Sequence, residues 1–215
     1  MNNTAWPEYR AIDRLKKRLG VGVFTCACLF LGSQAAAAGP ATDQLKGTID
    51  EVIRILTDKE MKKPERAEER RRLLEKVIGE RFSYEEMSKR ALGAQWNKIN
   101  DAQRKEFVTL FQRHLANAYA GKIEGYKGEQ IRFLNEREEQ GYAEVRSKIV
   151  TEKVEIPLDY RLINRSGDWR VYDVVVDGVS LVNNYRGQFN RIIRSSSYED
   201  LVEKLRKKSE DLKAP

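Results

Sequence analysis

The sequence predicts an α+β domain, in which an antiparallel sheet of about four strands packs with N- and C-terminal helices. Two changes in hydrophobic period lead to this expectation. Apolar residues recur at helical spacing over residues 42–126, alternate with a period of two over residues 128–176, and return to helical spacing from Ser180 to Leu212. Helices gathered before and after a run of strands are typical of an antiparallel sheet with a helical layer.

A leader precedes this domain. Residues 10–18 are rich in basic side chains, and residues 19–32 are apolar but too few to cross a bilayer. Small residues follow. We therefore expect residues 1–38 to be a secretory signal peptide, cut after Ala36 or Ala38, so that the remaining chain is secreted.

Both cysteines, Cys26 and Cys28, lie in this leader. A lipoprotein signal is the alternative. Such a signal needs a small residue directly before the cysteine and a Leu-like residue three positions upstream. Thr25 instead directly precedes Cys26 and lies three positions upstream of Cys28. After cleavage, residues 39–215 form a single domain without cysteine, which excludes disulfides and thiol chemistry.

The leader carries five basic and two acidic residues, so the formal net charge falls from +7 to +4. The remaining charges are mixed in sign, which argues against nucleic-acid binding.

The first helices are predicted from spacing and from capping residues. Apolar residues recur at helical spacing over residues 42–58 and 64–78. Ser83 and Glu86 form a capping box that begins a short helix, and Gly93 ends it.

The longest helix is expected from Asn100, which forms a capping box with Gln103, to about Tyr126. Its apolar residues make one stripe that contains Phe107, Leu110, Phe111, Leu115, Ala118, Tyr119 and Ile123. His114, the only histidine, lies at the border of that stripe. No partner ligands accompany it in the sequence, so we predict a packed side chain and no metal site.

Four strands are predicted from alternation, near residues 131–133, 143–149, 154–162 and 169–176. The turn at Asn164–Gly167 makes the last two a hairpin. Two helices then follow, the second of them capped by Ser197.

The sequence contains no glycine-rich phosphate loop, nucleophile elbow or HExxH motif. Asp173 is the one candidate for a general base. It shares a predicted strand face with Trp169, Val171 and Val175, where it would be partly buried. Such a carboxylate could act in a pocket, as in ketosteroid-isomerase-like enzymes. The simpler interpretation is a structural carboxylate paired with an arginine or a backbone amide, and we expect no enzymatic activity.

Several segments in order resemble the toluene-tolerance (MlaC) family of periplasmic phospholipid-binding proteins. The resemblance spans about Thr42 to Leu205 and rests on Leu92-Gly93-x-x-Trp96, the ladder Phe107, Phe111, Leu115, Tyr119 and Tyr126, the strand at 154–162, Trp169–Asp173 and Gly178–Leu181. It implies an NTF2-like appearance, in which a curved antiparallel sheet packs with the N- and C-terminal helices around an apolar cavity that holds phospholipid tails as cargo. No reaction and no other cofactor are implied.

The resemblance also implies partners. These are an outer-membrane lipoprotein–porin complex and an inner-membrane ABC transporter with its lipid-binding ring subunit. The protein, as a monomer, would carry phospholipid between them and so maintain the lipid asymmetry of the outer membrane.

The residues expected to line the acyl tails lie on the inward faces of the predicted elements: Phe111, Leu115, Tyr119, Val145, Ile149, Ile156, Leu158, Tyr160, Val171, Leu181 and Tyr185. Asn183 and Arg186, beside the strand-to-helix exit, could meet the phosphate of a head group, helped by amides at the helix N-terminus. Leu158→Glu or Tyr160→Glu is predicted to abolish lipid retention if the protein still folds.

One further alternative stays open. The apolar residues could simply fill a core without a ligand. The protein would then be an interaction module that works through charged surfaces such as residues 62–72.

Overall fold

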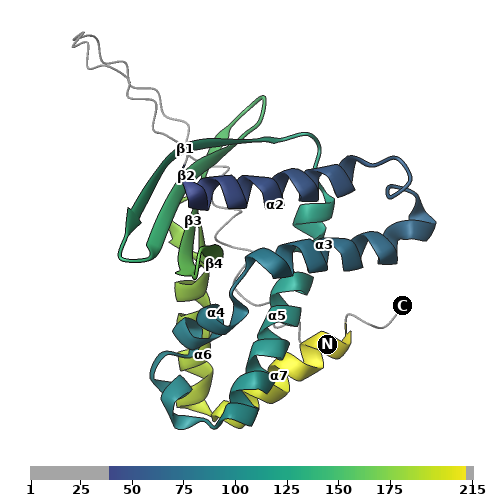
Figure 1. The fold of residues 1–215 in the computed structure, drawn as a ribbon. Helices are drawn as coiled ribbons and strands as arrows, with labels where there is room; N and C mark the ends of the chain where they lie inside the picture. Colours follow the sequence, from purple (N-terminus) through teal and green to yellow (C-terminus); the bar gives the residue numbers. More distant parts are fainter. Residues whose placement is uncertain (1–38, 212–215) are drawn as a thin grey trace, which may run out of the picture. The chain divides into compact units, whose positions relative to one another are not determined.

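The computed structural model describes residues 39–211, and the predicted signal peptide lies outside them. The described chain forms helices, then an antiparallel sheet, then two more helices, which confirms the predicted α+β class (Figure 1). The helices are α2 (Pro40–Thr57), α3 (Ala67–Arg81), α4 (Tyr84–Leu92), α5 (Asp101–Glu124), α6 (Leu181–Ser195) and α7 (Tyr198–Asp211). Two short 3-10 helices, η2 (Pro64–Arg66) and η3 (Gly93–Lys98), precede α3 and follow α4.

The sheet has five strands in the order β1-β2-β3-β4-β5, each antiparallel to its neighbour. Their bounds are Gln130–Glu139, Tyr142–Val150, Glu155–Arg165, Asp168–Val176 and Val179–Ser180. The sequence predicted about four strands, because β5 has only two residues and shows no alternation. Sequential pairing places the β1–β2 and β3–β4 turns at one end of the sheet and the β2–β3 turn at the other.

The predicted caps explain where the helices begin. Asn100 Oδ1 accepts a hydrogen bond from the amide of Gln103 (2.9 Å), and Gln103 Oε1 accepts one from the amide of Asn100 (3.0 Å). This reciprocal pair satisfies two amides that the first turn of α5 leaves without helical partners. At the start of α4, Ser83 Oγ accepts from the amide of Glu86 (3.4 Å), but the predicted capping box is only half formed, because the Ser83 amide donates to the carbonyl of Val171 (2.8 Å).

The apolar core has three parts. A helical core joins α4, α5, α6 and α7 through residues such as Phe107, Tyr185 and Leu205. A sheet core joins α2 to β2, β3 and β4, and a smaller cluster joins the second half of α2 to α3. Phe82 packs against both the helical core and the sheet core. Figure 1 shows the corresponding division, with α2 beside the sheet and α4 to α7 gathered beyond β4.

Candidate functional site

One face of the sheet is apolar along its length. In the strand register Val145 lies opposite Tyr160, Ile149 opposite Ile156, and Leu162 opposite Val171. Directly opposite residues point to the same side of a sheet, as do residues two apart along a strand. All six strand residues that were expected to line acyl tails therefore share this apolar sheet face: Val145, Ile149, Ile156, Leu158, Tyr160 and Val171.

The apolar sheet face is covered unevenly. At the end with the β3–β4 turn, Ala41, Leu45 and Ile49 of α2 pack on it, and Leu162 and Trp169 are buried there. At the opposite end the face reaches the surface. Ile149 and Ile156 are only half-buried, while Val176 is 37% and Val179 is 52% exposed. We call this region, formed by Ile149, Ile156, Val176 and Val179, the uncovered end of the apolar sheet face.

The N-terminus of α2 is fixed to the sheet by polar contacts. Glu136 of β1 accepts hydrogen bonds from the amide (2.7 Å) and the hydroxyl (2.6 Å) of Thr42. The positive end of the α2 helix dipole also stabilises an anion at this position. Gln44 Oε1 accepts from the amide of Trp169 (2.9 Å) and from the Arg81 guanidinium (2.9 Å). These contacts hold the covered end of the apolar sheet face closed.

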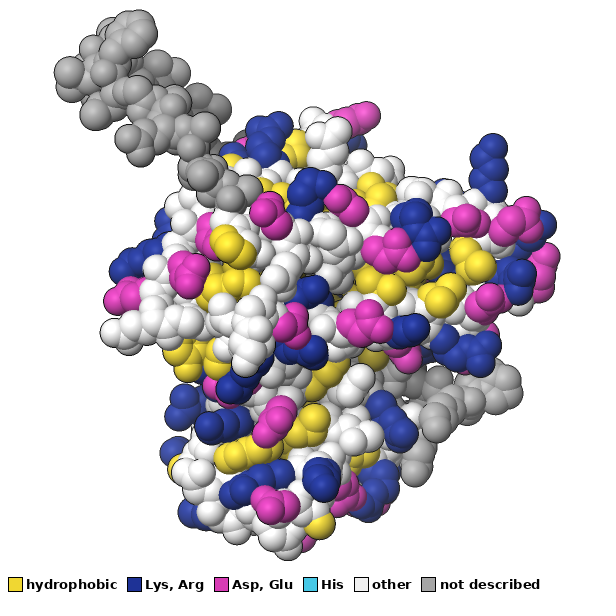
Figure 2. All heavy atoms as spheres, in the orientation of Figure 1, with side chains coloured by type: hydrophobic (Ala, Val, Ile, Leu, Met, Phe, Trp, Pro, Cys, Tyr) yellow, Lys and Arg dark blue, Asp and Glu magenta, His cyan; other side chains and the backbone are white. Residues whose placement is uncertain are grey.

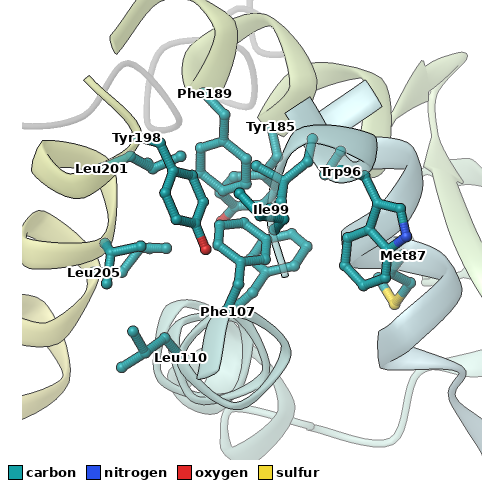
Figure 3. Packing of buried hydrophobic residues seen from close by; sticks show 14 of the residues in the cluster. Met87, Trp96, Ile99, Phe107, Leu110, Tyr185, Phe189, Tyr198, Leu201 and Leu205 are labelled. Atoms are coloured by element: carbon teal, nitrogen blue, oxygen red, sulfur yellow. The ribbon is translucent and has the colours of Figure 1, made fainter. Parts of the chain in front are cut away.

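The helical residues of the predicted tail site lie in the helical core. Phe111, Leu115 and Tyr185 are buried there, and Tyr119 and Leu181 pack at its margin. The Phe111 and Tyr185 rings meet edge to face with centroids 5.1 Å apart, a favourable aromatic geometry. Figure 3 shows Tyr185, Phe189 and Phe107 directed toward one another within this core. The helical and strand residues therefore belong to two packed clusters.

Asp173 does not lie where unbroken alternation placed it. The β3–β4 register shifts between Arg161 and Leu162, so that Leu162 pairs with Val171 but Arg161 pairs with Asp173. This β-bulge at Tyr172 turns Asp173 to the face opposite the apolar sheet face, and the expectation that it shares a face with Val171 is wrong.

The carboxylate of Asp173 is occupied by structural partners. Its Oδ2 accepts from Arg161 (3.0 Å) and from the Ser180 hydroxyl (2.6 Å), and its Oδ1 accepts from the amide of Val182 (3.0 Å). It therefore holds the first turn of α6, as the simpler interpretation predicted. These bonds occupy three of the roughly four acceptor sites of the carboxylate.

A hollow of about 540 Å³ lies between α4, η3, α6 and the outer face of the sheet. We call it the basic hollow. Asn183 and Arg186, the predicted head-group residues, both line it. Its charged lining residues are Glu86, Lys89, Arg90, Arg161, Asp173 and Arg186. Sequence reasoning missed Lys89, Arg90 and Arg161, because only the packing of α4 and β3 near α6 brings them together.

Cation–π contacts orient part of this lining. The Arg90 guanidinium lies 4.1 Å from the ring centroid of Tyr172 and 5.7 Å from that of Tyr142. The half-buried position of the Tyr172 ring raises the pKa of its hydroxyl, chiefly through desolvation. On the face drawn in Figure 2, basic and acidic side chains are interspersed, so the described surface there carries no one-sided basic stripe.

Comparisons with known proteins identify the family. A model of the family described as MlaC protein matches residues 46–207. The chain belongs to the MlaC family. Within it, the chain is 25% identical over 122 residues to the "Intermembrane phospholipid transport system binding protein MlaC" of Haemophilus influenzae (strain ATCC 51907 / DSM 11121 / KW20 / Rd). That match covers 54% of this chain and 57% of the Haemophilus protein, so the chain spans little more than half the length of this curated relative.

A solved structure supports the fold of this MlaC-family chain. It is the phospholipid-binding protein from Ralstonia solanacearum in complex with a phospholipid, with a TM-score of 0.70 and 22% sequence identity. The match covers 80% of this chain and 98% of that one. Among residues 39–211, no helix combines the length and apolar character needed to span a membrane. The same residues contain no cluster of three or more histidine, cysteine or acidic side chains suited to a metal ion.

Proposed function

We propose that this protein is a periplasmic phospholipid carrier that encloses acyl tails against the apolar sheet face. The observation that carries the proposal is the uneven covering of that face, because an apolar surface that emerges at one end offers an entry for a hydrocarbon chain. Membership of the MlaC family supports it, as do the lipid named for the Haemophilus relative and the lipid bound by the Ralstonia neighbour.

Physical chemistry explains why such a carrier is needed. A lipid with about 30 methylene groups costs on the order of 24 kcal/mol to expose to water, at ~0.8 kcal/mol per group. Spontaneous passage through an aqueous compartment is therefore negligible. The apolar sheet face would replace the bilayer, and apolar walls of this kind discriminate between tails only weakly, by length and volume.

The proposal assigns two walls to the tail site. The strand wall consists of Val145, Ile149, Ile156, Leu158, Tyr160 and Val171, and the helical wall consists of Phe111, Leu115, Tyr119, Leu181 and Tyr185. Tails would enter at the uncovered end and separate the sheet core from the helical core, which meet at Phe82. Asn183 and Arg186 are the proposed head-group residues.

The finer assignments belong to the same proposal. The protein would be secreted with residues 1–38 as its signal peptide and would act as a monomer without a reaction. It would carry lipid between an outer-membrane lipoprotein–porin complex and an inner-membrane ABC transporter with its lipid-binding ring subunit. Phospholipid is the cargo, and no other cofactor is proposed.

Native mass spectrometry of protein isolated from a Gram-negative periplasm, followed by lipid extraction, tests the proposal. Bound masses that match diacyl phospholipids are expected, and they would also count the tails held. A ligand-free mass that stays unchanged after incubation with phospholipid vesicles would overturn the proposal. The tightly packed helical core would then favour an interaction module with a closed interior.

A further inference from the structure

The basic hollow is not explained by tail binding. It lies on the other side of the sheet from the apolar sheet face, since Tyr142, Arg161 and Asp173 line it. Arg161 pairs with Asp173, and Tyr142 pairs with Ile163, in the register of the outward-facing residues. A hollow of about 540 Å³ with four cationic residues is therefore a separate feature of the surface.

Charge is unbalanced in this hollow. Glu86 is already paired with Arg90 (2.8 Å), and Asp173 with Arg161 (3.0 Å). Lys89 and Arg186 make no hydrogen bond or ion pair within the described part of the chain. Two cations thus face the same hollow without a carboxylate to neutralise them.

The side chain of Arg186 lies close to the backbone at Gly93. A Cβ atom built on Gly93 would lie 3.2 Å from both Nε and Nη2 of Arg186, a tight contact, so a larger residue at position 93 would require the Arg186 side chain to shift. Gly93 has a φ of +56° and a ψ of −124°, a conformation that other residues rarely adopt. The glycine therefore leaves room for the guanidinium to lie beside η3 at the edge of the hollow.

We propose that the basic hollow binds a phosphate group through Arg186 and Lys89. The planar guanidinium matches phosphate oxygens in a two-pronged geometry, and the lysine ammonium supplies a compact second charge. The hollow is larger than a phosphate ion, so it leaves room for an attached polyol. A lipid head group and a free phosphate ester share this chemistry, and the head-group case rests on the proposed function.

The first arm of the test measures phosphate binding directly. Inorganic phosphate and glycerol 3-phosphate are titrated into lipid-free protein, followed by amide chemical shifts. Arg186→Gln and Lys89→Gln are each expected to raise the Kd by about tenfold or more, the effect of losing a hydrogen bond to a charged group. Arg191→Gln, an exposed charge on α6 outside the hollow, is the matched control and should leave the Kd unchanged. Raised ionic strength should weaken the binding to wild type.

The second arm identifies the source of the phosphate. Each variant is incubated with phosphatidylglycerol vesicles, and lipid retention is measured by native mass spectrometry. Loss of both phosphate binding and lipid retention would support the head group as the ligand. Loss of phosphate binding alone would support a free phosphate ester.

The proposal is overturned if wild type shows no phosphate-dependent shifts in the basic hollow and if the Gln variants retain lipid as Arg191→Gln does. Lipid retention by wild type in that case would leave the carrier function standing. Absence of lipid from wild type, with phosphate binding intact, would instead count against the carrier function alone. Circular dichroism of each variant verifies the fold.

Discussion

Replacement of Ile156 by glutamate tests the tail site most directly. Ile156 lies opposite Ile149 at the uncovered end, where it is half-buried, so the folded protein can keep a carboxylate there in contact with water. A bound acyl tail would remove that water. By contrast, Leu158 and Tyr160 are 9% and 7% exposed in the covered part of the face, and burial raises the pKa of Tyr160. Glutamate at either position is therefore expected to unfold the sheet as well as to empty the site.

The magnitude follows from protonation. An ordinary glutamate has a pKa of about 4.3, so keeping it neutral at pH 7 costs about 3.7 kcal/mol. Lipid binding to Ile156→Glu should therefore fall by up to about 500-fold at pH 7 and recover as the pH approaches 4. Leu134→Glu makes the same chemical change at a site on β1 that is 45% exposed, and it should retain lipid. Native mass spectrometry at both pH values measures the occupancy. Full occupancy of a folded Ile156→Glu protein at pH 7 would refute the assignment of this face.

Three further results are expected. Glu136→Ala removes both hydrogen bonds to Thr42. Urea unfolding should therefore show a free energy of unfolding lower by about 1–2 kcal/mol, and amide hydrogen exchange should quicken first in α2. Unchanged exchange in α2 would contradict the anchoring role. Asp173→Asn weakens the hydrogen bonds to Arg161 and Val182 and should lower the free energy of unfolding by about 1–3 kcal/mol, without loss of an enzymatic activity. Unchanged thermal stability would argue against the role of Asp173 in holding the first turn of α6. Burial raises the pKa of Tyr84 and Tyr198 to about 12, against about 10 in the unfolded chain. The stability that these two neutral hydroxyls contribute is therefore complete below pH 10 and is lost as the pH rises toward 12. The difference in phenolate absorbance between wild type and Tyr84→Phe or Tyr198→Phe reports the ionisation of each tyrosine. Ionisation of either one near pH 10 in the native protein would contradict the expectation.

The sequence predicted the elements whose local signals are strong. The Asn100 capping box marked the start of α5, clean alternation marked β3, and a stretch that is largely apolar on both faces marked β4. β1 was predicted too short, because its second half, from Glu136 to Glu139, is charged. An edge strand can carry such residues, since one of its sides has no neighbouring strand and its charges deter pairing with other chains.

The remaining differences arise from tertiary structure. The bulge at Tyr172 could not be predicted from the sequence. Both faces of β4 are largely apolar, so the hydrophobic pattern does not show where the strand changes register. The basic hollow could be predicted only in part. Asn183 and Arg186 are near each other on one helix, but Lys89 joins them through the packing of α4 against α6, which no local pattern encodes.

The bulge has a mechanical consequence. Upstream of Tyr172, β4 contributes Val171 to the apolar sheet face; downstream, it contributes Asp173, whose carboxylate holds Val182 at the start of α6. One strand therefore forms the wall of the proposed tail site and the support of the helix that carries Arg186. If cargo displaces β4, the first turn of α6 must move with it or lose its hydrogen bonds to Asp173. The filling of the apolar sheet face would then be communicated through β4 to the basic hollow on the other side of the sheet.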